Sequence, residues 1–331
     1  MALTARLAQA VRRHGAPGAV AGLSRAGTRE LAAAGTLTED TMVRTASITK
    51  PIVTFAVLSA CAAAGSTVDD RVLDLLPELR SVWRVSPGLT VRQLLDHTGG
   101  LRLDVDAAED LAGTVAAVVG AGPAYRPGTA WRYNNAGYWV AELVLARLAG
   151  TGFEEALRQL VLEPAGMTRT GFTPTGTRAG GHAAGTPYDP VRPRGRRASG
   201  GLWSTAGDLL SFAEYALGDG SVLLSAALRR PWHAKQRGGR YALGWELSPG
   251  PATVAWHDGN GSGFRGRLLV VPAYDFGAVV VTNDSERRGV LDDVLRPELA
   301  RLPGVRLPSR IGLATTSLAG QTRLALALLR R

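Results

Sequence analysis

The strand-like segments of this chain lie near its two ends, and the segments between them have a mostly helical pattern. Two short apolar runs at residues 19–23 and 30–34, separated by Gly27, predict a hairpin near the start. Three further β-like runs follow near the other end, at residues 253–256, 268–271 and 278–282. This order predicts an α/β (α+β) fold in which an antiparallel sheet is assembled from both chain ends, with a helical region inserted between them.

Two helices are expected in the first part of the chain. Residues 3–13 have the pattern of an amphipathic surface helix. A second helix is expected to begin at Ser47 and to run to about Ala64, where Gly65 ends it. Pro51 fits this helix only because it falls in the first turn, where the missing amide hydrogen has no helical partner.

Two later helices have equally clear end signals. Residues 135–149 are expected to form a helix that Gly150 closes. A closing helix is expected over residues 286–299, where Pro297 should kink it or end it near Arg296.

These patterns define the expected organisation of the chain. Residues 1–303 are expected to form one domain, with a sheet part from residues 1–66 and 195–303 and a helical subdomain over about 67–194. Residues 304–331 form an apolar and basic tail. A packed terminal helix, a surface-binding amphipathic helix and disorder are all open for this tail.

Composition is typical of a soluble globular protein. The chain has 331 residues, of which 45% are apolar and 20% are charged. Cys61 is the single cysteine, so no intrachain disulfide can form, and a small buried side chain is the favoured interpretation of it. It lies in the apolar run 52–64, which is too short to span a bilayer, and the first residues lack the core of a signal peptide. We therefore expect a cytoplasmic protein without an integral membrane segment.

The formal charge of +10 is the one unusual feature of the composition. Basic residues are spread along the chain, so a solvated arginine-rich surface is favoured over nucleic-acid binding, which would predict salt-dependent retention of DNA. No zinc-ligand spacing is present, and neither a metal nor an organic cofactor is expected. Of the 38 basic side chains only Lys50 and Lys235 are lysines. A lysine that persists in such a chain indicates a position where arginine, which cannot be deprotonated, does not serve.

Ser47-Ile48-Thr49-Lys50 is the first group of residues that points to chemistry. On a helix, residues three apart share a face, so the serine hydroxyl and the lysine amine can meet. A serine is a poor nucleophile until a neighbouring base takes its proton, and a helix N-terminus favours the oxyanion that then develops. The alternative is that Ser47 only caps the helix and Lys50 is solvated.

Two further groups accompany it. Tyr133 and Asn135 lie in PGTAWRYNNAGYWV, where a tyrosine near cations can act as a general base and an asparagine amide can hold a lysine or a substrate carbonyl. His257, Gly259 and Asn260 lie in WHDGNGSGFRG between two apolar runs. The alternatives are a core tyrosine, a helix-capping asparagine and a satisfied structural histidine.

The three groups in this order resemble the serine β-lactamase and penicillin-binding protein superfamily. The segments RTASITKP, LTVRQLLDHTGGL and GGLWSTAGDLLSF strengthen the resemblance, which covers roughly residues 10–300. It is closest to class C β-lactamases, family VIII carboxylesterases and D-amino-acid peptidases, whose second motif is Tyr-x-Asn. The resemblance implies the β-lactamase/transpeptidase-like fold, with an antiparallel sheet flanked by helices and an all-helical subdomain.

The resemblance also implies roles for individual residues. Ser47 would be the nucleophile, Lys50 its proton partner and Tyr133 the base for Ser47 and later for the deacylating water. Asn135 would orient Lys50 and the substrate. The backbone amides of Ser47 and Asn260, the residue after Gly259, would form the oxyanion hole.

His257 stands where the third motif of the family often begins with lysine. A permanent charge is thereby replaced by a titratable one, which shifts the expected substrate from carboxylate-bearing β-lactams and D-alanyl peptides toward neutral esters or amides. Arg265 and Arg240 are the candidates to restore the charge. A serine hydrolase of small-molecule esters or amides is the expected function. An acyltransferase, a β-lactamase or D-alanyl peptidase, and a non-catalytic ligand-sensing module are the alternatives.

Overall fold

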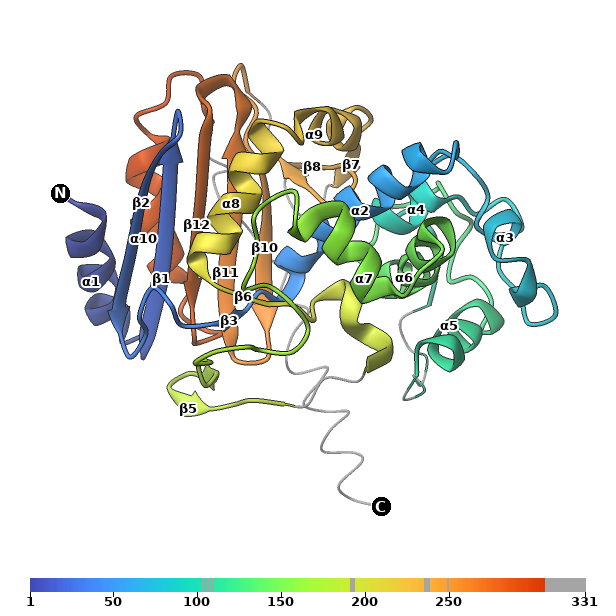
Figure 1. The fold of residues 1–331 in the computed structure, drawn as a ribbon, viewed down its shortest axis with the longest axis horizontal. Coiled ribbons are helices and arrows are strands. Elements are labelled where there is room, and N and C mark those ends of the chain that lie inside the picture. The colour runs from blue at the N-terminus through green and yellow to red at the C-terminus, as the bar shows by residue number, and fades with distance from the viewer. Residues whose placement is uncertain are drawn as a thin grey trace.

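The chain folds around one large antiparallel sheet that joins its two ends (Figure 1). This computed structural model describes residues 1–306, apart from residues 103, 104, 106, 107, 109, 191–193, 235–238 and 249. The tail from residue 307 onward and Lys235 therefore lie outside the described residues. The sheet has the strand order β2-β1-β12-β11-β10-β9-β8-β7.

The strands of this sheet come from the segments that the sequence pattern indicates. Their bounds are Gly18–Arg25 (β1), Thr28–Gly35 (β2), Trp232–Ala234 (β7), Gly239–Tyr241 (β8), Glu246–Leu247 (β9), Ala255–Gly261 (β10), Phe264–Val271 (β11) and Phe276–Thr282 (β12). Strand β1 pairs with β12, so the prediction of a sheet built from both chain ends is confirmed. Two short pairs lie apart from it, formed by Val43–Arg44 (β3) with Trp203–Ser204 (β6) and by His182–Ala183 (β4) with Thr186–Pro187 (β5).

The predicted hairpin at the start of the chain is present as β1 and β2. Arg25 pairs with Thr28, so only Ala26 and Gly27 form the loop. Both loop residues have positive φ, 46° for Ala26 and 78° for Gly27, as a two-residue turn of the type that suits twisted strands requires.

Helices α1 (Leu3–His14) and α10 (Arg288–Leu299) cover one face of the sheet (Figure 1). The alternative that Pro297 ends α10 near Arg296 is wrong, because the helix continues to Leu299. Two contacts fix its last turn: Leu299 packs into the core between helices and sheet, and the buried Glu298 carboxylate pairs with Arg6 of α1.

The other face is covered by α2 (Thr49–Ala63), α8 (Ala206–Leu217) and α9 (Ser221–Leu228). Aromatic rings connect α2 and α8 to the sheet. Phe55 of α2 lies edge-on to Phe212 of α8, and Phe212 stacks on Trp245. Trp245 directly precedes β9, so the packing links α2 to the strands beyond β10.

The inserted region is mostly helical and lies beside one edge of the sheet (Figure 1). Its α-helices are α3 (Val72–Leu75), α4 (Val91–Leu95), α5 (Leu111–Gly120), α6 (Ala136–Ala149) and α7 (Phe153–Leu157). Helix α6 ends at Gly150, whose φ of 66° allows the left-handed cap, as the sequence predicts. A π-helical turn at Arg158–Leu162 and a 3-10 segment at Arg194–Ser199 (η4) follow.

Helix α2 begins two residues later than the sequence suggests. Ser47 lies in a preceding 3-10 turn, Ala46–Ile48 (η1), and α2 itself starts at Thr49. The 18 residues Ala46–Ala63 are long and apolar enough to cross a membrane, but 78% of them are buried inside the protein, as expected of a core helix. Cys61 is buried on this helix and unpaired, which confirms the interpretation of it as a small buried side chain.

Candidate active site

Ser47 occupies a tight turn at the entrance to α2. The preceding Ala46 has a φ of 46°, a left-handed conformation that is unfavourable for a residue with a side chain and is often found at functional sites. Ser47 is half-buried. It is neither the first residue nor the N-cap of α2, whose cap position is Ile48. The turn therefore presents the Ser47 side chain just outside the helix.

Lys50 lies in the first turn of α2 and is fully buried. Its Nζ donates to Ser47 Oγ at 3.1 Å and to the carbonyl oxygen of Ser199 at 2.5 Å. The same nitrogen lies 5.0 Å from the ring centre of Tyr133 and 5.3 Å from that of Tyr138. The predicted meeting of Ser47 and Lys50 is thus present, and aromatic faces enclose the amine.

Tyr133 approaches Ser47 from the segment that precedes α6. Its hydroxyl lies 2.8 Å from Ser47 Oγ, in a hydrogen bond that the tyrosine donates. Its ring packs against His97, with ring centres 4.4 Å apart. Ser47 Oγ is therefore within proton-transfer distance of both the Lys50 amine and the Tyr133 hydroxyl.

Asn135 stands at the N-cap position of α6, but its side chain makes no capping bond. The oxygen of the neighbouring Asn134 side chain accepts the Ala136 N–H at 2.7 Å instead. Asn135 Oδ1 is buried and has no hydrogen-bond partner among the described residues. The structure therefore does not join this oxygen to Lys50.

Strand β10 passes directly beside the turn that holds Ser47. A Cβ on Gly259 would lie 2.4 Å from the carbonyl oxygen of Thr45 and 3.4 Å from Ile48 Cγ1. Only a glycine fits there, because the strand lies against the protein's own chain. Asn260 follows Gly259 on the same strand, paired with Arg265 of β11.

His257 belongs to a buried chain of hydrogen bonds that includes His97 and Tyr241. The Asn134 N–H donates to His97 Nδ1 at 3.2 Å, so His97 Nε2 carries the proton toward the Tyr241 hydroxyl at 3.0 Å. His257 Nδ1 lies 2.7 Å from the carbonyl oxygen of Asp258, which only accepts, so this nitrogen is protonated. His257 Nε2 lies 3.1 Å from the Tyr241 hydroxyl. Both ring nitrogens of each imidazole therefore have partners.

Arg265 and Arg240 are the two candidates to replace the lysine of the third motif. Neither lies on the face of the sheet that carries His257. Arg267 of β11 forms a two-pronged ion pair with Asp258, at 2.5 and 2.9 Å, on the face opposite to His257. Arg265 lies two residues earlier on the same strand and therefore shares that opposite face. Arg240 is exposed and alternates with the inward-facing Tyr241 on β8.

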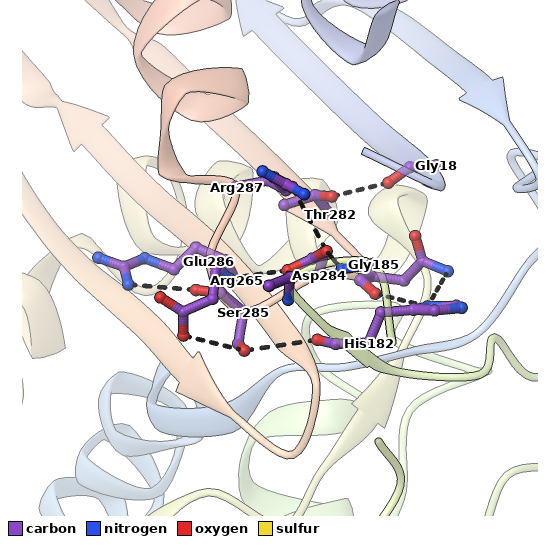
Figure 2. Close-up of polar contacts among 11 residues, drawn as sticks. Gly18, His182, Gly185, Arg265, Thr282, Asp284, Ser285, Glu286 and Arg287 are labelled. Carbon is purple, nitrogen blue, oxygen red and sulfur yellow. Dashed lines mark hydrogen bonds and ion pairs between the residues drawn. The ribbon is translucent and has the colours of Figure 1, made fainter. Parts of the chain in front are cut away.

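The turn between β10 and β11 is anchored from outside by the β4–β5 hairpin. The His182 N–H donates to the Gly263 carbonyl at 3.0 Å. Figure 2 shows the polar contacts at this anchor, where the fully buried Asp284 carboxylate accepts the N–H groups of Ala184 at 3.1 Å and Gly185 at 2.7 Å. These contacts hold the end of β10, which carries Asn260.

Sequence patterns did not single out three residues of this arrangement. Ser199, His97 and Tyr241 contact the motif residues across long stretches of chain, and no spacing brings them together in the sequence. The only available signal was that His97 lies within the segment LTVRQLLDHTGGL. Among the described residues, no group of three or more His, Cys, Asp or Glu side chains is arranged to hold a metal ion.

Comparison with known proteins gives the family of the chain. A model of the Beta-lactamase family matches residues 3–301. The chain belongs to the Beta-lactamase family. It is a serine hydrolase with the β-lactamase/transpeptidase-like fold, as the sequence resemblance implies.

Individual relatives span several activities of this family. Penicillin-binding protein 4 of Amycolatopsis lactamdurans is 28% identical over 306 residues, covering 82% of this chain and 80% of that protein. Esterase EstB of Burkholderia gladioli is 33% identical over 156 residues, 40% of this chain and 39% of that protein. A class C β-lactamase structure from Rhodobacter sphaeroides superposes with a TM-score of 0.74 at 22% identity, covering 90% and 99% of the two chains, and shows the shared fold.

Gly259→Ala tests the close approach of β10 to the Ser47 turn. The added methyl group would meet the Thr45 carbonyl at 2.4 Å, so the strand or the turn must shift. We expect a loss of about 1–3 kcal/mol in unfolding free energy and a large fall in ester hydrolysis. Gly180→Ala, where the added methyl group meets nothing within 4 Å, is the control for both measurements. Unchanged stability and activity in Gly259→Ala would contradict the tight contact.

Proposed function

We propose that Ser47 is the nucleophile of this hydrolase and forms a covalent acyl-enzyme with an ester or amide substrate. The observation that carries the proposal is that Ser47 Oγ lies 3.1 Å from Lys50 Nζ and 2.8 Å from the Tyr133 hydroxyl. A serine becomes a useful nucleophile when such a neighbour takes its proton during attack.

Tyr133 and Lys50 share the proton handling in this proposal. Ser47 Oγ attacks the substrate carbonyl carbon while its proton passes to the Tyr133 oxygen, in its deprotonated form, with Lys50 stabilising the negative charge. The proton then goes to the leaving alcohol or amine as the bond to the carbonyl carbon breaks. Water, deprotonated by Tyr133, attacks the acyl-enzyme. Lys50 gives a proton to the departing Ser47 oxygen and takes the proton held by Tyr133, which releases the acid and free Ser47.

The oxyanion would be stabilised by the backbone amides of Ser47 and Asn260. The support is that β10 lies against η1, where Gly259 and Thr45 are in direct contact, so the next residue on the strand is close to the serine turn. Asn135, with its unsatisfied side-chain oxygen, is the proposed partner for the substrate or for Lys50.

The domain organisation supports the same site. We propose that residues 1–303 form the hydrolase domain and that about 67–194 form its helical subdomain. Ser47 then comes from the start of α2, Tyr133 from the helical subdomain and Gly259 from the sheet, so that catalysis takes place where the two parts meet.

Neutral esters or amides are the substrates that we propose. His257 has both ring nitrogens engaged, by Tyr241 and by the Asp258 carbonyl. Arg265 lies on the opposite face of the sheet, and Arg240 is exposed. The third motif therefore contributes no fixed positive charge for a substrate carboxylate, and a small neutral acyl substrate fits the site better.

Ser47→Ala is the direct test of the nucleophile. We expect a fluorophosphonate probe to add one adduct to the wild-type protein, at the peptide that contains Ser47, and no adduct to the variant. Ester hydrolysis should disappear while the circular dichroism spectrum stays the same, because the substitution removes one oxygen from a half-buried position. A folded variant that retains full activity would refute the proposed function.

A substrate panel tests the inference about charge. We expect kcat/KM for short-chain neutral esters to exceed kcat/KM for penicillins and for D-Ala-D-Ala peptides. The physical reason is that a substrate carboxylate would have to enter the site without a cation from the third motif. A clear preference for carboxylate-bearing β-lactams would show that another positive group serves there.

A further inference from the structure

One hydrogen-bond acceptor of the Lys50 amine belongs to a segment that is far away in the sequence. Lys50 Nζ donates to the carbonyl oxygen of Ser199 at 2.5 Å. Ser199 is the last residue of the 3-10 segment η4, and 149 positions separate it from Lys50. The position of the amine beside Ser47 therefore depends on how firmly η4 is held.

Helix α6 holds the end of η4 through buried polar contacts. The Ala198 N–H donates to Glu142 Oε2 at 3.1 Å, and Arg197 Nη2 donates to Glu142 Oε1 at 3.2 Å. One turn earlier on α6, Trp139 Nε1 donates to Ser199 Oγ at 3.0 Å. Two side chains of one helix thus fix three consecutive residues of η4.

Glu142 is the unusual member of this group. Its side chain has no exposed surface, whereas its partner Arg197 is 25% exposed and the other carboxylate on that arginine, Glu154, is 54% exposed. A buried carboxylate is costly unless it is paired and hydrogen-bonded, and here both oxygens are used to bind η4.

We propose that ionised Glu142 is a positioning residue for Lys50, acting through residues 197–199 of η4. The inference rests on the proposed function, in which Lys50 handles protons for Ser47. The charged carboxylate accepts the Ala198 N–H and holds the Arg197 guanidinium, and the Ser199 carbonyl is thereby kept at the amine. Glu142 does not touch the substrate.

The ionisation of Glu142 gives this role a pH dependence. Burial raises the pKa of the Glu142 carboxyl to about 7, against the opposing effects of Arg197 and the Ala198 N–H. As the pH falls through this value the carboxyl becomes neutral, the attraction to Arg197 is lost and one oxygen becomes a donor. The same raised pKa means that protonated Glu142 favours the folded state, so its contribution to stability is full below pH 4.5, the ordinary pKa, and is lost as the pH rises through about 7.

The charged surroundings of Glu142 are set by the elements that pack on α6. The nearest charges that act on it are Arg197 and Glu154. The remaining ionisable groups on those elements, among the described side chains, are Lys50 and Cys61 on α2, Asp74 on α3, Arg92 on α4, Glu155 on α7 and Arg196 in η4; α5 has none.

The test is the ratio of wild-type kcat to Glu142→Gln kcat, measured from pH 5 to 9 with a neutral ester. Glutamine keeps the size and one acceptor but cannot ionise, and ionisations of Lys50 and Tyr133 cancel in the ratio. We expect a ratio of about ten above pH 8, since a displacement of about 1 Å in a catalytic group can cost 10²-fold in rate. The ratio should approach one below about pH 6, where wild-type Glu142 is also protonated, and KM should change little.

Glu154→Gln is the matched control, because it removes the same charge from the same arginine at an exposed position. The ratio of wild-type kcat to Glu154→Gln kcat should stay near one above pH 8, where Glu142 is ionised in both proteins. A Glu142→Gln ratio that equals the control, or that is large but independent of pH, would overturn the proposal. Ser47→Ala is measured in parallel: if it is active, the proposed function fails, and if it is inactive while the Glu142→Gln ratio is flat, only this inference fails.

Arg197→Gln serves if Glu142→Gln does not fold. Removal of the guanidinium takes away the charge that lowers the Glu142 pKa, so the carboxyl should take up its proton at higher pH. The rise of kcat with pH should therefore lie at higher pH in the variant than in the wild type, whatever plateau the variant reaches. A rise at the same pH in both proteins would contradict a role for ionised Glu142.

Discussion

The rest of the site depends on the hydrogen bonds of the Lys50 amine, which is buried inside the protein. A polar group removed from water is costly unless hydrogen bonds replace its hydration. Here the replacement comes from Ser47 Oγ and the Ser199 carbonyl, with the rings of Tyr133 and Tyr138 around them. The amine therefore brings together the start of α2, the segment before α6 and the end of η4.

The fold explains how segments so far apart reach one amine. The sheet joins the two chain ends through the pairing of β1 with β12, which leaves the inserted helices beside the opposite part of the sheet. Strand β10 completes the arrangement, because Gly259 allows it to lie in contact with Thr45 next to the serine turn. The residues proposed to carry the chemistry thus rest on elements that are packed on both faces of the sheet.

Local spacing was sufficient to predict part of this site. Ser47 and Lys50 are three residues apart, and any helical or 3-10 turn brings such residues together, so the prediction of their contact did not depend on the exact start of α2. The predicted start of α2, at Ser47, was wrong by two residues, since nothing in the sequence shows that Ala46 adopts a positive φ. Pro297 was likewise expected to end α10, and packing of Leu299 overrides that local preference.

Contacts between distant segments were beyond the reach of sequence patterns. The bonds of Ser199 to Lys50 and of Tyr241 to His97 and His257 join positions that no periodicity relates.

The measurement that tests the central role of the enclosed amine most directly is kcat/KM of Lys50→Arg beside that of Lys50→Ala, with folding checked by circular dichroism. Arginine keeps a positive charge and a long side chain but cannot release its proton, and its planar guanidinium does not reproduce the geometry of bonds to Ser47 Oγ and the Ser199 carbonyl. The account predicts that both variants lose at least about 10²-fold in kcat/KM, the lower range of what a positioned acid–base group contributes. A folded arginine variant with most of the wild-type activity would contradict it, because charge alone would then suffice at this position.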